Sequence, residues 1–111
     1  MRSTTEVLHD HLMKRLQGDV EGDLSNYSQD VVMLTGSGEF RGHEGVMQCA
    51  GELDRIVGDA EFAYDTTMVS GEYGFLQWSA SSGDAAVCDG ADSFVVRDGL
   101  IVMQTVHYTP R

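Results

Sequence analysis

The chain of 111 residues has few prolines and cysteines. Its single proline, Pro110, stands beside the last residue, so no proline-rich linker divides the chain. Its two cysteines, Cys49 and Cys88, belong to no metal-ligand or redox motif, and no basic-then-apolar leader opens the sequence. We therefore expect reduced thiols and a cytoplasmic protein. One domain is expected, since about 100–150 residues is the commonest domain size.

Basic residues and long apolar runs are also scarce. Seven Lys and Arg against 18 Asp and Glu leave a formal net charge of −11. Such a chain repels phosphate backbones and anionic lipid, so neither nucleic acid nor a membrane surface is an expected partner. Even the apolar run from Gly99 to Val106 is far shorter than the ~18 residues of a membrane span. Apolar residues still make up 41% of the chain, which argues against disorder.

The N-terminal segment predicts two helices. A capping box at residues 3–6 begins the first, and leucines recur every four residues from Leu8 to Leu16. Gly18 ends this helix, and Asp19 caps a second, short one. The first helix therefore carries one apolar stripe that a core must cover.

The rest of the chain predicts one long helix and several strands. A buried strand is expected at 31–35, a short one at 39–41, and an amphipathic helix from about His43 to Val57. From residue 60 the apolar period changes to two, and Asp98-Gly99 predicts a tight hairpin turn. The expected late strands are 60–70, 73–81, 85–96 and 100–108. This order of elements is α+β rather than alternating βαβ.

Several strands lack a clean polar face. Residues 100–103 read Leu-Ile-Val-Met and are apolar on both sides, whereas a sheet with one solvated face should alternate. We expect the second face to be covered by another copy of the chain. The sequence therefore predicts a homodimer that pairs through the sheet.

The sequence resembles the nuclear transport factor 2-like superfamily, in particular its SnoaL-like and ketosteroid-isomerase-like members. Residues 16–24 are similar to the break between the first two helices of the family, and 40–46 (FRGHEGV) to the start of its third helix. Residues 92–102 (DSFVVRDGLIV) resemble its closing hairpin. The resemblance implies one cone-shaped α+β domain over residues 1–111. A curved antiparallel sheet would wrap around the long helix, and the N-terminal helices would close the open end.

The resemblance also implies a mostly apolar pocket inside the cone and pairing through the outer sheet face. The superfamily includes isomerases, cyclases, hydratases, dehydratases and non-enzymes, so the fold is weak evidence for activity. We expect a small, mostly apolar organic ligand with acid–base chemistry of isomerase, cyclase or hydratase type. The alternative is a non-catalytic dimeric ligand-binding or interaction module. No cofactor or metal is expected, since no phosphate loop appears and His43-Glu44 lacks the second His of a zinc motif.

Asp92 is the first candidate catalytic residue. A period of two places it on one strand face with Phe94 and Val96, and apolar neighbours should raise the pKa of its carboxyl. Its position in the closing hairpin matches the acid of ketosteroid isomerase, which stays protonated and donates a hydrogen bond to substrate. The alternative is a structural Asp bonded to a backbone amide or a neighbouring hydroxyl.

Two positions depart from the ketosteroid isomerase pattern. The general base of those enzymes corresponds to a position near Thr35, and a hydroxyl there does not take a proton from carbon at neutral pH. Their phenolic donor on the first helix corresponds to a position near His11. Steroid isomerisation by that mechanism is therefore not expected. His11 is either a substitute donor or base, or a histidine at the boundary of the leucine stripe.

Other candidates depend on which strand face looks into the cone. His107 alternates with Ile101, Met103 and Thr105. On an inward face His107 would pair with Asp92 as acid and base, and on an outward face it would lie at a dimer contact. The candidate ligand-binding residues are aromatic or sulfur-containing: Tyr27, Tyr64, Trp78, Phe94 and Met103. Each has core packing as its alternative role.

Overall fold

The computed structural model describes all 111 residues and has the expected α+β order. No helix combines the length and the apolar character needed to cross a bilayer. The elements are α1 (Thr4–Leu16), α2 (Val20–Asp23), the 3-10 turn η1 (Leu24–Asn26), β1 (Tyr27–Thr35), β2 (Gly38–Arg41), α3 (Gly42–Val57), β3 (Glu61–Ser70), β4 (Tyr73–Ser82), β5 (Ala85–Arg97) and β6 (Leu100–His107).

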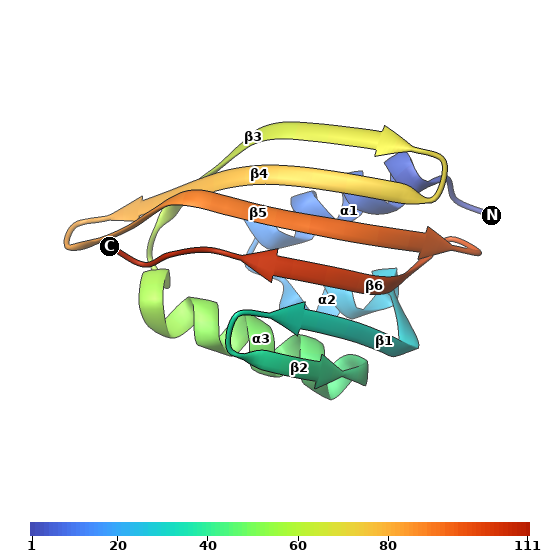
Figure 1. Ribbon diagram of the computed structural model, residues 1–111, viewed down its shortest axis with the longest axis horizontal. Coiled ribbons are helices and arrows are strands. Elements are labelled where there is room, and N and C mark those ends of the chain that lie inside the picture. Colours follow the sequence, from blue (N-terminus) through green and yellow to red (C-terminus); the bar gives the residue numbers. More distant parts are fainter.

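The strands form one six-stranded sheet in the order β2-β1-β6-β5-β4-β3 (Figure 1). Every neighbouring pair is antiparallel except β1 and β6, which run parallel. The expectation of a wholly antiparallel sheet is therefore wrong at this one pair. The reason is that both strands start at the same end of the sheet, where Tyr27 pairs with Ile101.

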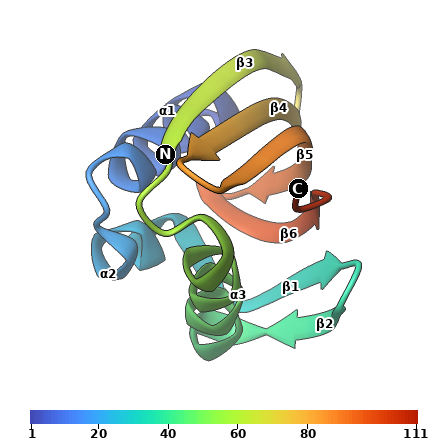
Figure 2. The same ribbon diagram turned by 90° about the vertical axis from the view of Figure 1, so that its left-hand side faces the viewer.

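The sheet curves around the helices. Figure 2 shows β3 to β6 as an arc with α1, α2 and α3 on its concave side. Register shifts at four strand pairings accompany the curvature, because a bulge bends a strand and increases its local twist. A core of 16 buried apolar residues fills the space between sheet and helices. This arrangement is the cone that the sequence resemblance implied.

Local sequence signals determine where the elements begin and turn. Ser3 Oγ accepts from the Glu6 backbone N–H at 3.1 Å, and the Glu6 carboxylate accepts from the Ser3 N–H at 2.9 Å. Asp19 caps α2 in the same way. Asp98 and Gly99 have φ values of 53° and 75°, as a tight hairpin turn with two positive φ angles requires. The capping box, the second cap and the hairpin are thus confirmed.

A bulge in β6 reverses the face on which its later residues lie. Val95 and Val96 are consecutive on β5, and they pair with Met103 and Ile101 of β6. Val102 lies between these two partners and is therefore an extra residue on β6. Ile101 is fully buried, whereas the exposed His107 shares the opposite face with Met103. A strict period of two fails here because the bulge adds one residue to the alternation.

Gly90 of β5 gives space to the indole ring of Trp78. The two residues are paired across β4 and β5, and a Cβ at Gly90 would overlap the ring atoms of Trp78. Glycine at this position therefore lets an aromatic ring lie flat against the neighbouring strand.

We predict that Gly90→Ala lowers the free energy of unfolding by about 1–3 kcal/mol, because an added methyl forces the ring or the strand to move. Urea denaturation followed by circular dichroism measures this loss. Gly83→Ala is the matched control, since a Cβ there meets nothing within 4 Å, and it should change stability by less than about 0.5 kcal/mol. Equal stability of Gly90→Ala and the wild type would contradict the close contact.

Candidate functional site

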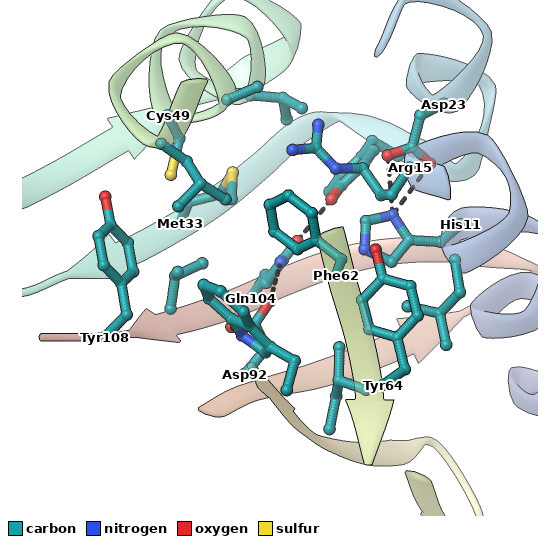
Figure 3. Close-up of a pocket in the computed structure, with 18 residues that line it drawn as sticks. His11, Arg15, Asp23, Met33, Cys49, Phe62, Tyr64, Asp92, Gln104 and Tyr108 are labelled. Atoms are coloured by element: carbon teal, nitrogen blue, oxygen red, sulfur yellow. Dashed lines mark hydrogen bonds and ion pairs between the residues drawn. The ribbon is translucent and has the colours of Figure 1, made fainter. Parts of the chain in front are cut away.

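A cavity lies inside the cone, between the concave face of the sheet and helices α1 and α3 (Figure 3). Eighteen residues line it, and 13 of them are hydrophobic. The volume of the enclosed cavity is about 60 Å³. The space free of protein atoms is about 600 Å³ when the open mouth is included. Ligand pockets usually measure about 300–1,000 Å³. The enclosed part therefore has room for a few waters or a small chemical group, and a larger ligand must also use the mouth.

Asp92 of β5 places a carboxyl group in the cavity wall, with 7% of the residue exposed. Trp78 Nε1–H donates to its Oδ1 at 3.0 Å, and Gln104 Nε2–H donates to its Oδ2 at 3.1 Å. Burial nevertheless raises the pKa of Asp92 to about 6, because the loss of water outweighs both hydrogen bonds. The rise has the direction that the apolar neighbours predicted. A carboxyl with this pKa can gain or lose a proton near neutral pH.

Tyr27 fixes the orientation of the Gln104 amide. The Tyr27 hydroxyl donates to Gln104 Oε1 at 2.6 Å, so the amide presents its NH₂ group to Asp92. Burial raises the pKa of Tyr27 well above its usual value, and the phenol therefore keeps its proton and remains a donor. Three strands, β1, β6 and β5, thus share one row of hydrogen bonds that ends at the carboxyl group.

His11 of α1 supplies a second polar group to the cavity. It is buried, and its Nδ1 lies 2.8 and 3.0 Å from the two carboxylate oxygens of Asp23. The Asp23 carboxylate occupies the Nδ1 side of the ring, so Nε2 is the ring nitrogen left for another partner. Every fully buried side-chain nitrogen has a hydrogen-bond partner, so the unpartnered Nε2 is open to the cavity. The ring packs edge-on against Tyr27 and Phe94, with centroids 5.9 and 5.5 Å away.

A polar network holds Asp23 from behind. Asn26 Nδ2 donates to Asp23 Oδ1 at 3.0 Å and to Asp10 Oδ2 at 2.8 Å. Asn26 Oδ1 in turn accepts from the Arg2 guanidinium at 2.6 Å. Asp23 is 1% exposed and Asn26 0%. The carboxylate that orients His11 is therefore locked in place, which fixes the imidazole as well.

Four further ionisable side chains line the cavity: Arg15, Cys49, Tyr64 and Tyr108. Burial raises the pKa of Cys49 to about 11 and that of Tyr64 to about 12. The Cys49 thiol stays protonated near neutral pH and does not supply a thiolate nucleophile. Tyr64 remains a hydroxyl donor with no partner in the chain, and Arg15 brings a permanent positive charge.

The chain matches the model of the SnoaL-like domain over residues 10–104. It belongs to the SnoaL-like domain family. No curated protein matches the chain in sequence.

Solved structures resemble this SnoaL-like domain in fold. An NTF-2-like protein of unknown function from Burkholderia xenovorans LB400 superposes with a TM-score of 0.78 at 18% identity, over 96% of this chain and 82% of that one. A protein of Kribbella flavida DSM 17836, provisionally named a ketosteroid isomerase, gives 0.81 at 16%, over 96% and 77%. TerC, co-crystallised with polyporic acid, gives 0.78 at 18%, over 96% and 91%. At these identities the likeness shows the fold alone.

The cavity brings together most of the residues predicted from the sequence. His11, Tyr27, Tyr64, Trp78 and Asp92 all line it. Trp78 therefore lies on the inner face of β4, a question that the sequence left open. The buried Asp92 accepts hydrogen bonds from two side chains rather than from a backbone amide.

Three predicted residues lie outside the cavity. His107 is on the outer sheet face with its side chain 65% exposed, and its Nε2 is 3.4 Å from Asp89 Oδ2. Met103 shares that outer face because of the bulge at Val102. Phe94 points inward as expected but is buried under the His11 ring instead of lining the cavity. The inward alternative for His107 is therefore wrong, and the expected placement of Met103 and Phe94 in the cavity wall is wrong as well.

The two departures from the ketosteroid isomerase pattern have structural counterparts. Thr35 lies at the turn between β1 and β2, where its hydroxyl donates to the Gly38 carbonyl at 3.2 Å. The β1 residue that lines the cavity deeper in is Met33, which cannot act as a base. His43 donates from Nε2 to the Tyr27 carbonyl at 3.0 Å and so connects α3 to β1 instead of facing the cavity.

Sequence analysis missed Asp23, Gln104 and Arg15. Asp23 lies three residues after Val20 and four before Tyr27, so the helical stripe through those two residues could have located it. Arg15 lies four residues after His11, on the same face of α1. Gln104 gave no such signal, because the bulge at Val102 sets its inward direction.

We predict that lowering the pH from 7 to 4.5 stabilises the wild type relative to Asp92→Asn by on the order of 2 kcal/mol. The pKa of Asp92 is about 6 when folded and ~3.9 when unfolded. Between these values the folded state binds a proton that the unfolded state lacks, so stability rises as the pH falls. Urea denaturation of both proteins at the two pH values measures the difference, and other groups cancel. A constant difference between the two proteins would contradict the raised pKa.

Proposed function

We propose that this SnoaL-like domain binds a small, mostly apolar organic molecule in its cavity and moves protons on it, as an isomerase or a lyase does. One observation carries the proposal: two groups suited to proton transfer near neutral pH, His11 and Asp92, line the same apolar cavity. The surroundings of the two groups differ, which suits them to different roles. The Asp23 carboxylate orients His11, whereas burial raises the pKa of Asp92.

His11 is the base in the proposed reaction. Its Nε2 lone pair takes a proton from a carbon atom beside a carbonyl group, and the Asp23 carboxylate stabilises the imidazolium that forms. The electron pair left by the proton moves onto the carbonyl oxygen, where the Tyr64 hydroxyl or a protonated Asp92 donates a hydrogen bond to the enolate. Return of the proton from His11 to another carbon completes an isomerisation. Loss of a β-hydroxyl that takes its proton from Asp92 completes a dehydration.

Two relatives by fold support a site of this type. One carries a provisional ketosteroid isomerase name, and the other was co-crystallised with polyporic acid. Thr35, near the base position of the ketosteroid isomerase pattern, carries a hydroxyl instead of a carboxylate, so the proposal assigns the base to α1 instead of to β1.

A non-catalytic ligand-binding module is the second candidate. It is favoured by the hydrogen bonds that both oxygens of Asp92 already accept within the chain. In that case Asp92, Gln104 and Tyr27 would connect strands of the cone, and the cavity would hold a ligand without changing it. The two candidates differ in whether a bound ligand exchanges protons with the protein.

We predict that some cyclic ketones and enones of steroid-like or polyketide-like shape raise the melting temperature in proportion to the logarithm of their concentration. For such a ligand in D₂O, the wild type should speed incorporation of deuterium beside the carbonyl, followed by NMR. His11→Gln should slow this exchange by about 10²–10⁴-fold, the usual contribution of a general base.

His9→Gln is the matched control for that experiment, because His9 is an exposed histidine on the same helix. It should leave exchange at the wild-type rate. Binding without exchange in the wild type would favour the non-catalytic module. The absence of any stabilising ligand would contradict the proposed site.

We also propose that two copies of the chain pair through the outer sheet face. Two rows of paired residues cross this face from β3 to β1 without a carboxylate or a basic group, and they end on β2 at Glu39 and Arg41. The rows are Met68, Phe75, Ser93, Thr105 and Leu34 in one, and Ser70, Tyr73, Val95, Met103 and Val32 in the other. Met68 is 63% exposed and Tyr73 60%. Because each copy carries a net charge of −11, these two uncharged rows are where two copies can approach closely.

We predict that light scattering gives a mass twice the 12.1 kDa of one chain. Phe75→Glu should reduce it to the mass of a single chain, because a carboxylate on this face would meet its own symmetry mate. Thr67→Glu adds the same charge at an exposed β3 position adjacent to the Met68 row but on the other side of the strand, and should leave the dimer intact. A wild-type mass of one chain would refute the dimer.

A further inference from the structure

Arg15 is the one Lys or Arg side chain that lines the cavity (Figure 3). Four of the other basic side chains have partners: Arg2 donates to Asn26, and Lys14 pairs with Asp10, Arg41 with Glu39 and Arg97 with Glu72. Arg15 is half-buried and has neither a hydrogen bond nor an ion pair within the chain. A guanidinium has five donors and keeps its charge at any physiological pH. The N–H donors of the Arg15 guanidinium are therefore available to a ligand in the cavity.

Arg15 also lies where the cavity meets a second space. A groove of about 360 Å³ runs along the outside of α3 beside the end of α1. Four residues line both spaces: Arg15, Ala50, Leu53 and Phe62. The inner cavity of about 60 Å³ is too small for most ligands on its own. A ligand that extends from the cavity into the groove therefore passes the Arg15 guanidinium.

The positive charge of Arg15 reaches the groups inside the cavity. It acts to lower the pKa values of Tyr27, Cys49, Tyr64 and Asp92, against the effect of burial. The surface around the cone is strongly acidic, with a net charge of −11 for the chain. Salt screens charges more than about 10 Å away at 0.1 M ionic strength, so an anion at the mouth responds mainly to the charged groups that line the two spaces. Arg15 is the one Lys or Arg among them, beside the carboxyl groups of Asp23, Asp92 and Asp54.

We propose that the ligand is an organic monocarboxylate, with its apolar body in the cavity and its carboxylate on the Arg15 guanidinium where the cavity meets the groove. This inference rests on the proposed function and specifies the ligand class of the same site. Guanidinium and carboxylate match in shape and form two parallel hydrogen bonds. One arginine neutralises one negative charge, whereas a phosphate dianion would need a second cation that the cavity does not have.

The geometry of α1 then sets which atoms of the ligand react. Arg15 follows His11 by four residues, so their backbones are about 6 Å apart along the helix axis. With its carboxylate held at Arg15, the ligand presents to His11 a carbon atom several bonds away from that carboxylate. Arg15 would therefore be a positioning residue for the proton transfer as well as a determinant of ligand class.

The test uses two probes that differ in charge and have nearly the same shape: cyclohexanecarboxylate and the neutral cyclohexylmethanol. Both are transparent where Trp78 absorbs, and Trp78 is the single tryptophan of the chain and lines the cavity. Titration of its fluorescence at pH 7.5 gives both dissociation constants. We expect the wild type to bind the carboxylate at least tenfold more tightly than the alcohol, as a charge-assisted hydrogen bond allows.

Arg15→Gln should remove this preference, leaving the two probes within about twofold of each other and the affinity for the alcohol unchanged. Arg15→Lys should keep part of it, since an ammonium supplies the charge without the paired donors. Arg55→Gln is the matched control, because it removes the same charge from an exposed position that lines neither space. It should behave as the wild type does.

The outcomes separate this inference from the proposed function. Equal affinity of the wild type for both probes, or a preference that survives in Arg15→Gln, would overturn the carboxylate class and leave the ligand site standing. Failure of both probes to bind at millimolar concentration would overturn the ligand site and this inference with it.

Discussion

The central interaction inside the cone is the binding of the buried Asp92 carboxyl group by neutral donors instead of by a cation. Only two neutral donors, Trp78 and Gln104, bind its oxygens. A paired Lys or Arg would have lowered its pKa and made it a permanent anion. Neutral donors stabilise the charged form less than burial destabilises it, so the pKa settles at about 6. The same contacts connect β4, β5 and β6, and through Tyr27 they reach β1. The side-chain bonds between these strands and the pKa of Asp92 therefore depend on the same residues.

The second buried carboxylate has the opposite surroundings. Asp23 lines the cavity beside His11, and the His11 ring and the Asn26 amide both donate to its carboxylate. The partner of its carboxylate is the His11 imidazole. A proton added to that ring would form an ion pair with Asp23 and would not leave an unpaired buried charge. Two carboxylates of one small core thus have different roles because their hydrogen-bond partners differ in kind. Asp92 faces the cavity with a pKa raised to about 6, whereas Asp23 holds the His11 ring in its orientation.

Local signals predicted most of the fold and part of the site. The capping box at Ser3, the stripe of the long helix and the Asp98-Gly99 turn act over a few residues, and all three appear where the sequence placed them. The parallel pairing of β1 with β6 joins residues about 70 positions apart, which no local pattern encodes. The bulge at Val102 is one extra residue, yet it sends His107 outward and brings Gln104 inward. Asp92 was predicted correctly because no bulge separates it from Phe94 and Val96, whereas Asp23 was missed although it follows a helical stripe.

Several polar groups that line the cavity have no hydrogen-bond partner in the chain. This feature is typical of a ligand-binding cavity and not of a packed core. Buried polar groups in folded proteins are almost always satisfied by other protein groups or by ordered water. Here the network behind Asp23 follows that rule completely, since no fully buried side-chain nitrogen or oxygen lacks a partner. The exceptions, His11 Nε2, the Tyr64 hydroxyl and the Arg15 guanidinium, belong to residues that all line one small space. A core built only for stability would gain by replacing them with apolar side chains, because each is partly desolvated without a protein partner. A ligand with an oxygen for each donor and a proton for the base would satisfy all three at once.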